Sequence, residues 1–171
     1  MNTSRVKLIN RDQSIFEHIL EGDEKLSDFL KINIAKKWSE FGASIFEYVL
    51  TKIKENPDSQ KWWTYLPILI DTNMLIGSCG YKGEPDDDGM VELGYEVAEA
   101  YRNQGYATEI TGLLVEQAFN EKGVTKILAH TLAEENASVN VLRKCNFKWV
   151  AEIADDEEGK IWRWELFKGN L

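Results

Sequence analysis

The chain has little cysteine, proline or histidine: two Cys, three Pro and two His in 171 residues. Cys79 and Cys145 lie far apart and form no CxxC pair, which is typical of a protein from a reducing compartment and predicts a cytoplasmic location. With His18 and His130 as the only histidines, a His-rich metal site or a His-based triad lacks its residues, so no metal is predicted.

Several other features are missing. The first 14 residues contain no apolar stretch of signal-peptide length, and no run of about 18 apolar residues predicts a membrane span. The sequence contains no GxxxxGK[ST], which argues against a nucleoside triphosphate loop, no GxGxxG, which argues against a dinucleotide fold, and no HExxH. Neither a repeat nor a Pro/Gly/Ser-rich linker divides the chain, so we expect one domain over residues 1–171.

Acidic residues are in excess, with 29 Asp and Glu against 20 Lys and Arg and a net charge of -9. Such a surplus repels phosphate backbones, so we expect no direct nucleic-acid partner. It favours a cationic substrate such as an amine, although the charge is equally explained by solubility alone. The acidic loops 86–88 and 155–158 leave the same two interpretations open, because they would either steer a cation or stand as solvated loop tips.

Apolar periodicity and turn residues predict a strand at 5–9, a helix from Ser14, and an amphipathic helix over 31–56 that stops before Pro57. Further strands are expected at 66–70, 74–81, 90–98, 126–132, 149–154 and 160–167, and further helices at 105–123 and 137–145. This order predicts a mixed α/β sheet that closes with a βαβ unit and a hairpin, rather than a doubly wound sheet. The tryptophans at 62, 63, 162 and 164 would either fill the core or line an acceptor pocket.

The segment 91–108 joins a strand to a helix through a short loop with Gly105 at the helix start. The first amides of a helix lack partners within it, and the helix dipole adds about half a positive charge, so such an end attracts phosphate. Arg102 would supply a further positive group. An ordinary turn is the alternative interpretation of a single glycine before a helix.

Two motifs resemble a known family. The run Arg102-Asn103-Gln104-Gly105-Tyr106-Ala107 resembles the Arg/Gln-x-x-Gly-x-Gly/Ala signature of the GNAT acetyltransferase superfamily. Residues 92–97 are similar to its ribosomal-protein-alanine acetyltransferase (RimJ/RimL-like) branch. Residues 136–147 resemble the helix of that branch that begins with Asn-x-x-Ser and ends in Lys-x-Gly-Phe. The resemblance extends over about residues 5–168, with 14–60 similar only in kind.

The resemblance implies a GNAT fold in which the strand ending at Val97 splays from the strand at 126–132 and admits acetyl-CoA. Val97 would bind the pantetheine arm through its backbone, and Asn136 would reach the pantetheine or a nearby backbone group. The pyrophosphate would lie on the loop, and the cofactor-binding residues implied there are Arg102, Asn103, Gln104, Gly105, Tyr106, Ala107 and Thr108.

The sequence departs from the branch at three places. Asn146 stands where the branch has glycine, and asparagine tolerates the left-handed conformation required there. Asn136 lies one residue nearer Ser138 than in many relatives, with Glu135 at the usual position. Leu142 occupies the place of a tyrosine that protonates the leaving thiolate in many members, so a tyrosine acid is not expected.

Glu92 is the candidate general base, acting directly or through water; the alternative is a solvated strand carboxylate. Ser138 is the candidate acid by family position; its alternative role is to cap the helix at 137–145. A strand amide near Val97 would meet the oxyanion. His130 lies in a strand that is apolar on both faces, and we expect a core histidine with its hydrogen bonds satisfied.

The predicted function is acetyl-CoA-dependent transfer of an acetyl group to a primary amine, in a direct ternary complex. The acceptor is a protein N-terminal α-amine or a small-molecule amine. A polyamine or aminoglycoside acetyltransferase and a non-catalytic acyl-CoA-binding module remain as alternatives. The expected partners are the amine acceptor and, as an open alternative, a second copy of the chain in a homodimer.

Overall fold

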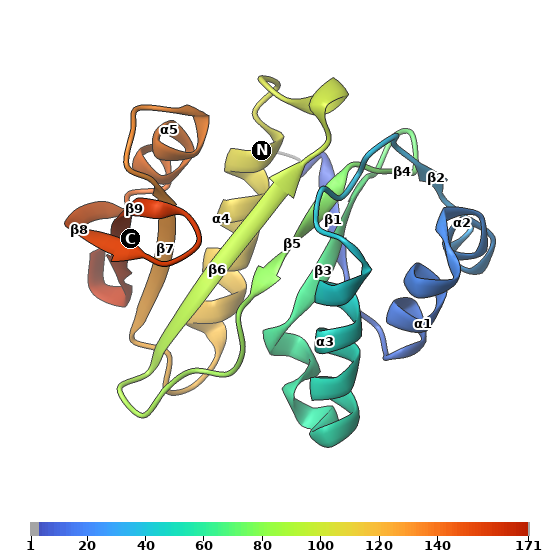
Figure 1. The fold of residues 1–171 in the computed structure, drawn as a ribbon, viewed down its shortest axis with the longest axis horizontal. Coiled ribbons are helices and arrows are strands. Elements are labelled where there is room, and N and C mark those ends of the chain that lie inside the picture. The colour runs from blue at the N-terminus through green and yellow to red at the C-terminus, as the bar shows by residue number, and fades with distance from the viewer. Residues whose placement is uncertain (1–3, 171) are drawn as a thin grey trace. The chain divides into compact units, whose positions relative to one another are not determined.

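The computed structural model describes residues 4–170, and its contacts divide the chain into two compact units. The first unit contains Met1–Gly80 and Tyr95–Tyr106, and the second contains Tyr81–Gly94 and Ala107–Leu171. Strand β6 (Met90–Val97) therefore contributes residues to both units, as does helix α4 (Tyr106–Asn120) (Figure 1). The segments alternate between the units along the sequence, which is why no linker is visible in it.

Strand β3 (Thr64–Leu69) is the centre of the first unit. It pairs antiparallel with β1 (Val6–Ile9), β4 (Met74–Leu75) and β5 (Gly77–Tyr81), and β2 (Asn33–Ile34) is parallel to β4. The helices of this unit are α1 (Ser14–Glu21), α2 (Asp23–Leu30), α3 (Ala43–Glu55) and the 3-10 turn η1 (Pro57–Trp62). They bury a common core with the sheet, including Leu26, Ile53, Ile68 and Leu75.

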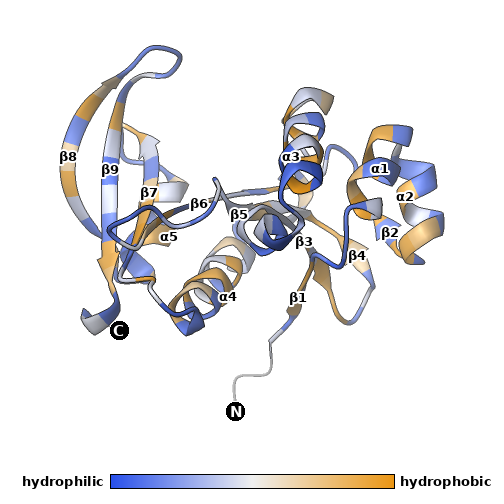
Figure 2. Cartoon of the chain, turned by 90° about the horizontal axis from the view of Figure 1, so that it is seen from below, coloured by the Kyte–Doolittle hydropathy of each residue, from blue (hydrophilic) through white to orange (hydrophobic). Residues whose placement is uncertain are grey.

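The predicted helix over 31–56 is correct only in its second half. Helix α3 begins at Ala43, after an extended Gly42, while its end before Pro57 is confirmed. The preceding backbone pairs with β4 instead, because Ala35 N donates to Leu75 O at 3.0 Å. Trp38, which fits the helical spacing, is buried by a different route and donates from Nε1 to Asp23 at 2.9 Å. Pairing with a distant strand has overridden the local period, and Figure 2 shows the amphipathic α3 that remains.

The second unit is built on β7 (Lys126–Leu132). The first residues of β6 pair parallel with β7, Met90–Glu92 against Lys126–Leu128. β9 (Gly159–Phe167) pairs antiparallel with β7 along the whole length of β7. β8 (Lys148–Asp155) is antiparallel to β9, and helix α5 (Ala137–Lys144) precedes it. The 3-10 turn η3 (Lys168–Asn170) follows β9, whereas the 3-10 turn η2 (Glu99–Tyr101), which follows β6, belongs to the first unit. The predicted βαβ unit and closing hairpin are confirmed.

The strand pairings fit a mixed, mostly antiparallel sheet with flanking helices, as predicted; the splay of β6 from β7 stays a prediction. Trp62, Trp63 and Trp164 are buried, which supports the core interpretation for three of the tryptophans. Within residues 4–170, no helix has the length and hydropathy needed to cross a bilayer.

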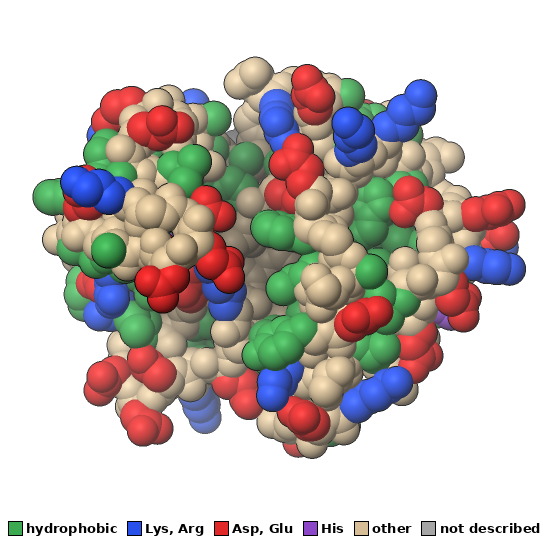
Figure 3. All heavy atoms as spheres, in the orientation of Figure 1, with side chains coloured by type: hydrophobic (Ala, Val, Ile, Leu, Met, Phe, Trp, Pro, Cys, Tyr) green, Lys and Arg blue, Asp and Glu red, His purple; other side chains and the backbone are tan. Residues whose placement is uncertain are grey.

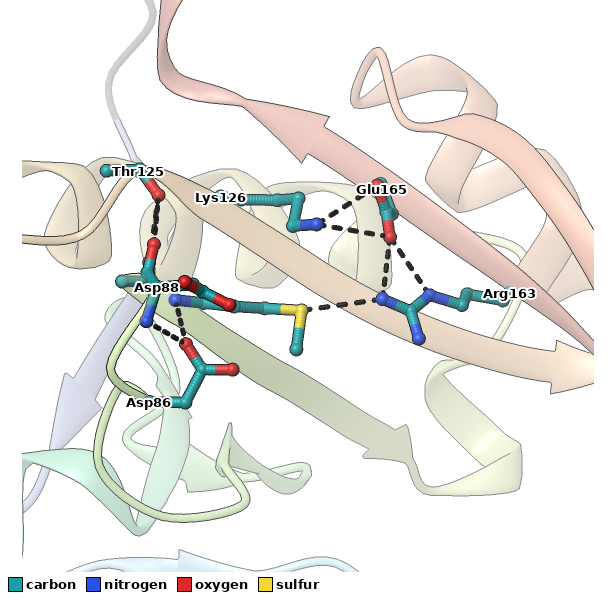
Figure 4. Close-up of polar contacts among 8 residues, drawn as sticks. Asp86, Asp88, Thr125, Lys126, Arg163 and Glu165 are labelled. Carbon is teal, nitrogen blue, oxygen red and sulfur yellow. Dashed lines mark hydrogen bonds and ion pairs between the residues drawn. The ribbon is translucent and has the colours of Figure 1, made fainter.

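The two faces of β7 carry different side chains. On one face Trp164 of β9 is 2% exposed and donates from Nε1 to Thr131 at 3.0 Å. The other face holds Leu128 and His130, opposite Glu165 and Arg163 of β9 in the register. Figure 4 shows the charged end of this face, where Glu165 bonds Arg163 at 2.7 Å and pairs with Lys126 at 3.4 Å. Polar side chains thus gather on one face of the sheet of the second unit.

Candidate active site

The loop between β6 and α4 contains two residues in the left-handed region. Asn103 has φ 60° and Gly105 has φ 85°, both of which these residue types tolerate. Helix α4 begins immediately afterwards at Tyr106. Its first amides lack acceptors within the helix, as at every helix start, so the residues expected to hold phosphate, Gln104 to Thr108, do occupy a helix N-terminus.

Arg102 ties this loop to the end of β6. Its Nε donates to Val97 O at 2.8 Å, and its Nη2 lies 3.2 Å from the Glu40 carboxylate. The first contact takes one lone pair of the Val97 carbonyl, a group that the resemblance assigned to the pantetheine arm. Arg102 therefore stabilises the end of β6 through a hydrogen bond within the chain. Its contact with a phosphate stays a prediction.

Arg5 also lies at the loop, and sequence reasoning missed it. Its Nη1 donates to Gln104 O at 3.2 Å, across 99 residues, and its guanidinium stacks at 4.4 Å from the Tyr106 ring centroid. A Cβ built on Gly105 would stand 3.4 Å from Arg5 Nη2. The sequence contained no motif for this placement, because it follows from the pairing of β1 with β3. A guanidinium beside helix-start amides adds positive charge where phosphate would bind.

Glu96 follows Glu92 on the same strand face but has a structural role. Its Oε1 accepts from Ser78 Oγ at 2.7 Å, and its Oε2 accepts from Glu40 N at 3.0 Å. The first bond joins β6 to β5, and the second joins β6 to the segment before α3. This carboxylate therefore positions the strand end next to Val97.

Glu92 is neither solvated nor alone. Its side chain is 21% exposed, and its Oε1 lies 2.5 Å from Lys82 Nζ and 2.9 Å from His130 Nδ1. Burial raises the pKa of Glu92, but the hydrogen bonds from Lys82 and His130 outweigh burial and hold the pKa below its ordinary value. A carboxylate held in its ionised form is a weak base, so direct proton abstraction by Glu92 loses support.

His130 differs from the satisfied core histidine that the sequence predicted. Nδ1 bonds Glu92, but Nε2 is buried and has no hydrogen-bond partner within residues 4–170. The prediction was wrong for Nε2. The sequence of β7 is apolar on both faces, but in the structure His130 bonds Glu92 of β6, which in turn bonds Lys82. The unpaired nitrogen was not visible in any motif.

Asn136 and Ser138 stand at the start of α5. Asn136 is extended and its Oδ1 accepts from Val139 N at 3.0 Å, so Asn136 is the helix cap. The alternative role of Ser138 as that cap is wrong, because Ser138 is already the second helical residue. Contact of Asn136 with a donor molecule and proton donation by Ser138 both stay predictions.

Thr108, the last of the implied loop residues, lines a pocket of about 410 Å³ with residues of α4 and α5, among them Gly112, Val115, Phe119, Lys144 and Cys145. Lys144 contributes a cation to this pocket. Cys145 is half-buried, and burial raises the pKa of its thiol, so this group is a neutral lining residue at pH 7. The lining is mostly apolar and carries one cation, Lys144, and one carboxylate, Glu116.

Residues 9–148 match the family model described as an acetyltransferase (GNAT) domain, which covers more than half of the chain. The chain belongs to the GNAT acetyltransferase family. This GNAT chain is 24% identical over 151 residues to the protein named uncharacterized N-acetyltransferase YjdG of Bacillus subtilis, with 86% of this chain and 88% of that protein covered. The expected family is thereby confirmed, and with it an N-acetyltransferase activity.

Solved structures share the fold at low identity. A spermidine N-acetyltransferase SpeG chimera from Vibrio cholerae and hSSAT superposes with a TM-score of 0.70 at 13% identity, covering 97% of each chain. A ribosomal-protein-S5-alanine acetyltransferase from Vibrio fischeri superposes with a TM-score of 0.71 at 12% identity, covering 98% of this chain and 95% of that one. Both confirm the GNAT fold of this chain.

Proposed function

We propose that the protein transfers an acetyl group from acetyl-CoA to a primary amine, with both substrates bound at once. The choice of acetyl-CoA as the acetyl donor rests on the loop at Gly105, where the helix-start amides and the Arg5 guanidinium lie together. Acetyl-CoA supplies the acetyl group as a thioester, which is activated for attack by a neutral amine. A diphosphate is the ligand that this combination of amides and cation suits best.

Each group of the chain has a place in this proposal. Gln104 to Thr108 hold the diphosphate through their amides, and Arg5 adds charge. The Val97 amide, whose carbonyl Arg102 already engages, serves the pantetheine arm and the oxyanion. The two units act together as one domain over residues 1–171, and we expect this domain in the cytoplasm.

The pKa of the acceptor favours an α-amine. Keeping an α-amine of pKa about 7.7 to 8.0 neutral at pH 7 costs roughly 1 to 1.4 kcal/mol, whereas a lysine-type amine near 10.4 costs about 4.6 kcal/mol. The low pKa of Glu92 makes it a poor base for the second task. We therefore propose the N-terminal amine of a peptide or protein as the first acceptor to test.

A polyamine is the second candidate acceptor. The net charge of -9 attracts cations, and a similar fold is found in a spermidine acetyltransferase. Figure 3 shows acidic side chains spread among Lys and Arg over the face in view, rather than gathered in one patch. Asp86 and Asp155 bind amides of their own loops, as expected for loop tips. The charge thus supports a cationic acceptor without selecting one.

The test is thiol release from acetyl-CoA in the presence of Ala- and Ser-initiated peptides, spermidine and an aminoglycoside. Release with the peptides supports the α-amine. Release with spermidine or the aminoglycoside alone transfers the assignment to that amine. Binding of acetyl-CoA by calorimetry without release above hydrolysis for any acceptor would favour a non-catalytic acyl-CoA-binding module, and absence of binding would overturn the proposal as a whole.

A further inference from the structure

The hydrogen bond at Nδ1 determines which nitrogen of His130 carries the proton. Glu92 is ionised at neutral pH and has acceptor atoms only, so the 2.9 Å contact requires His130 to donate from Nδ1. In the neutral imidazole the lone pair is then on Nε2. The ring is thereby held in the tautomer that can accept a proton at Nε2.

Nothing within residues 4–170 uses that lone pair. Nε2 is buried without a hydrogen-bond partner, although the side chain as a whole is 20% exposed. A buried acceptor without a donor is unfavourable, and such atoms in native proteins call for an explanation. Leu128, two residues before His130 on the same strand face, is 5% exposed and has no side-chain donor.

We propose that His130 is the proton acceptor of the acetyl transfer, taking a proton at Nε2 from the ammonium group of the acceptor, with Glu92 as the positioning residue that holds the ring. The inference rests on the proposed function and assigns the base within it. The donor that Nε2 lacks is an N–H of the amine, supplied directly or through one water molecule.

The charges around the ring suit this role. They come from four segments and are Glu92 of β6, Lys82 after β5, Asp155 of β8 and Arg163 of β9. Glu92 stabilises the imidazolium directly, while Lys82 opposes it and shares the same carboxylate oxygen. Asp155 is influenced by both His130 and Lys82, and Arg163 is engaged by Glu165. Two carboxylates and two cations therefore surround the imidazole, with the Glu92 carboxylate in direct contact with it.

The acetyl transfer moves two protons and one acetyl group. His130 takes one proton from R–NH3+, and the freed lone pair of nitrogen forms the bond to the carbonyl carbon of the thioester. The carbon–sulfur bond breaks with its electron pair on sulfur. The second proton leaves nitrogen for that sulfur and gives the free thiol, and the imidazolium returns its proton to water. The products are the amide, the thiol and one proton.

The experiment compares pH profiles of kcat/KM for wild type, His130→Asn and His18→Asn, with an acceptor that wild type turns over. The asparagine amide can still donate to Glu92, so the ion pairs are retained while the base is lost. With an α-amine acceptor, we expect His130→Asn to lower kcat/KM about tenfold at pH 7 and to recover towards wild type as pH approaches the pKa of the amine. His18, stacked on Phe29 in the first unit, provides the same substitution as a control, and its profile should match wild type.

Glu92→Gln tests the positioning role. A glutamine keeps an oxygen that can accept from both Lys82 and His130 but carries no negative charge to stabilise the imidazolium. This variant should therefore lose activity towards the level of His130→Asn, with little further loss in the double variant. An unchanged profile in His130→Asn overturns the assignment of His130 while leaving the proposed function intact. Absence of turnover by wild type with every amine overturns the proposed function and the assignment together.

Nitrogen-15 NMR of the wild-type imidazole gives a result that depends on neither turnover nor the folding of a variant. The His18→Asn spectrum identifies the His130 signals. In the neutral imidazole we expect a protonated Nδ1 and a bare Nε2. A predominant Nε2–H tautomer contradicts the proposal directly.

Discussion

The Gly105 loop and the His130–Glu92 pair are built from different parts of the chain. The loop offers backbone amides, shaped by left-handed residues and supplemented by the guanidinium of Arg5, which directly precedes β1. The pair consists entirely of side chains on two neighbouring strands. Ligand binding by backbone amides should respond to substitutions that change the backbone conformation or the local charge. The function of a side-chain pair should respond to the replacement of single side-chain atoms. The two can therefore be disturbed separately.

The largest expected effect is that of Gly105→Asp. Aspartate tolerates the left-handed φ of 85° better than most residues, so the fold should survive. Its carboxylate would stand where phosphate is expected and would pair with Arg5, whose Nη2 lies 3.4 Å from the new Cβ. We expect the Kd for acetyl-CoA, measured by calorimetry, to rise about 100-fold, or roughly 3 kcal/mol.

Gly159→Asp is the matched control for that variant. Gly159 has φ 79° in the β8–β9 turn, and a Cβ there meets nothing within 4 Å. The backbone demand and the added charge are the same, but the loop at α4 is untouched. If both variants weaken acetyl-CoA equally, the effect is one of net charge and the Gly105 loop is not the donor site.

Glu92→Gln should show its effect in the pH dependence of stability. The pKa of Glu92 is lowered from 4.5, so its stabilising contribution is present above pH 4.5 and is lost as pH falls through the lower native pKa. We expect wild type to exceed the variant by about 2 kcal/mol at pH 7, because bonds to a charged group are broken. Urea unfolding at pH 7 and pH 3.5 should show this difference shrinking at the acidic end.

Glu152→Gln is the control for an exposed ion pair. Glu152 bonds Lys160 at 2.9 Å, and hydrogen bonds from Lys160 and Trp162 also lower its pKa, but it lies in open solvent. Exposed pairs contribute little, so its unfolding free energy should change far less at pH 7. Equal losses in the two variants would mean that the half-buried position of Glu92 has no energetic consequence.

Arg5→Met should weaken acetyl-CoA about tenfold, or roughly 1.4 kcal/mol, because it removes the cation while keeping most of the apolar contact with Tyr106. Arg5→Lys should fall between, since lysine keeps the charge but cannot stack as a plane. Lys7, two residues further along the chain, is exposed on β1, and Lys7→Met is the control that should leave Kd unchanged. The salt dependence of binding should also decrease in Arg5→Met alone.

The sequence predicted those parts that depend on local pattern. The strand 126–132, the helix from 137 and the Gly105 loop were correct because period, capping and glycine act over a few residues. The helix over 31–42 was wrong because β4 competes for that backbone. Arg5 and the open Nε2 of His130 were missed for the same reason: each depends on a strand neighbour far away in sequence.

Asn136→Ala has the smallest expected effect and separates capping from binding. The Asn136 side chain accepts from Val139 N, so its removal should lower the unfolding free energy by about 1 kcal/mol. Asn136→Asp keeps an acceptor in place and should remain near wild type in stability. Because the cap uses Oδ1, we expect the Kd for acetyl-CoA to be the same in all three proteins. A rise of Kd in Asn136→Ala beyond what its stability loss explains would assign the Asn136 side chain to the donor site, and that site would then depend on a side chain as well as on amides.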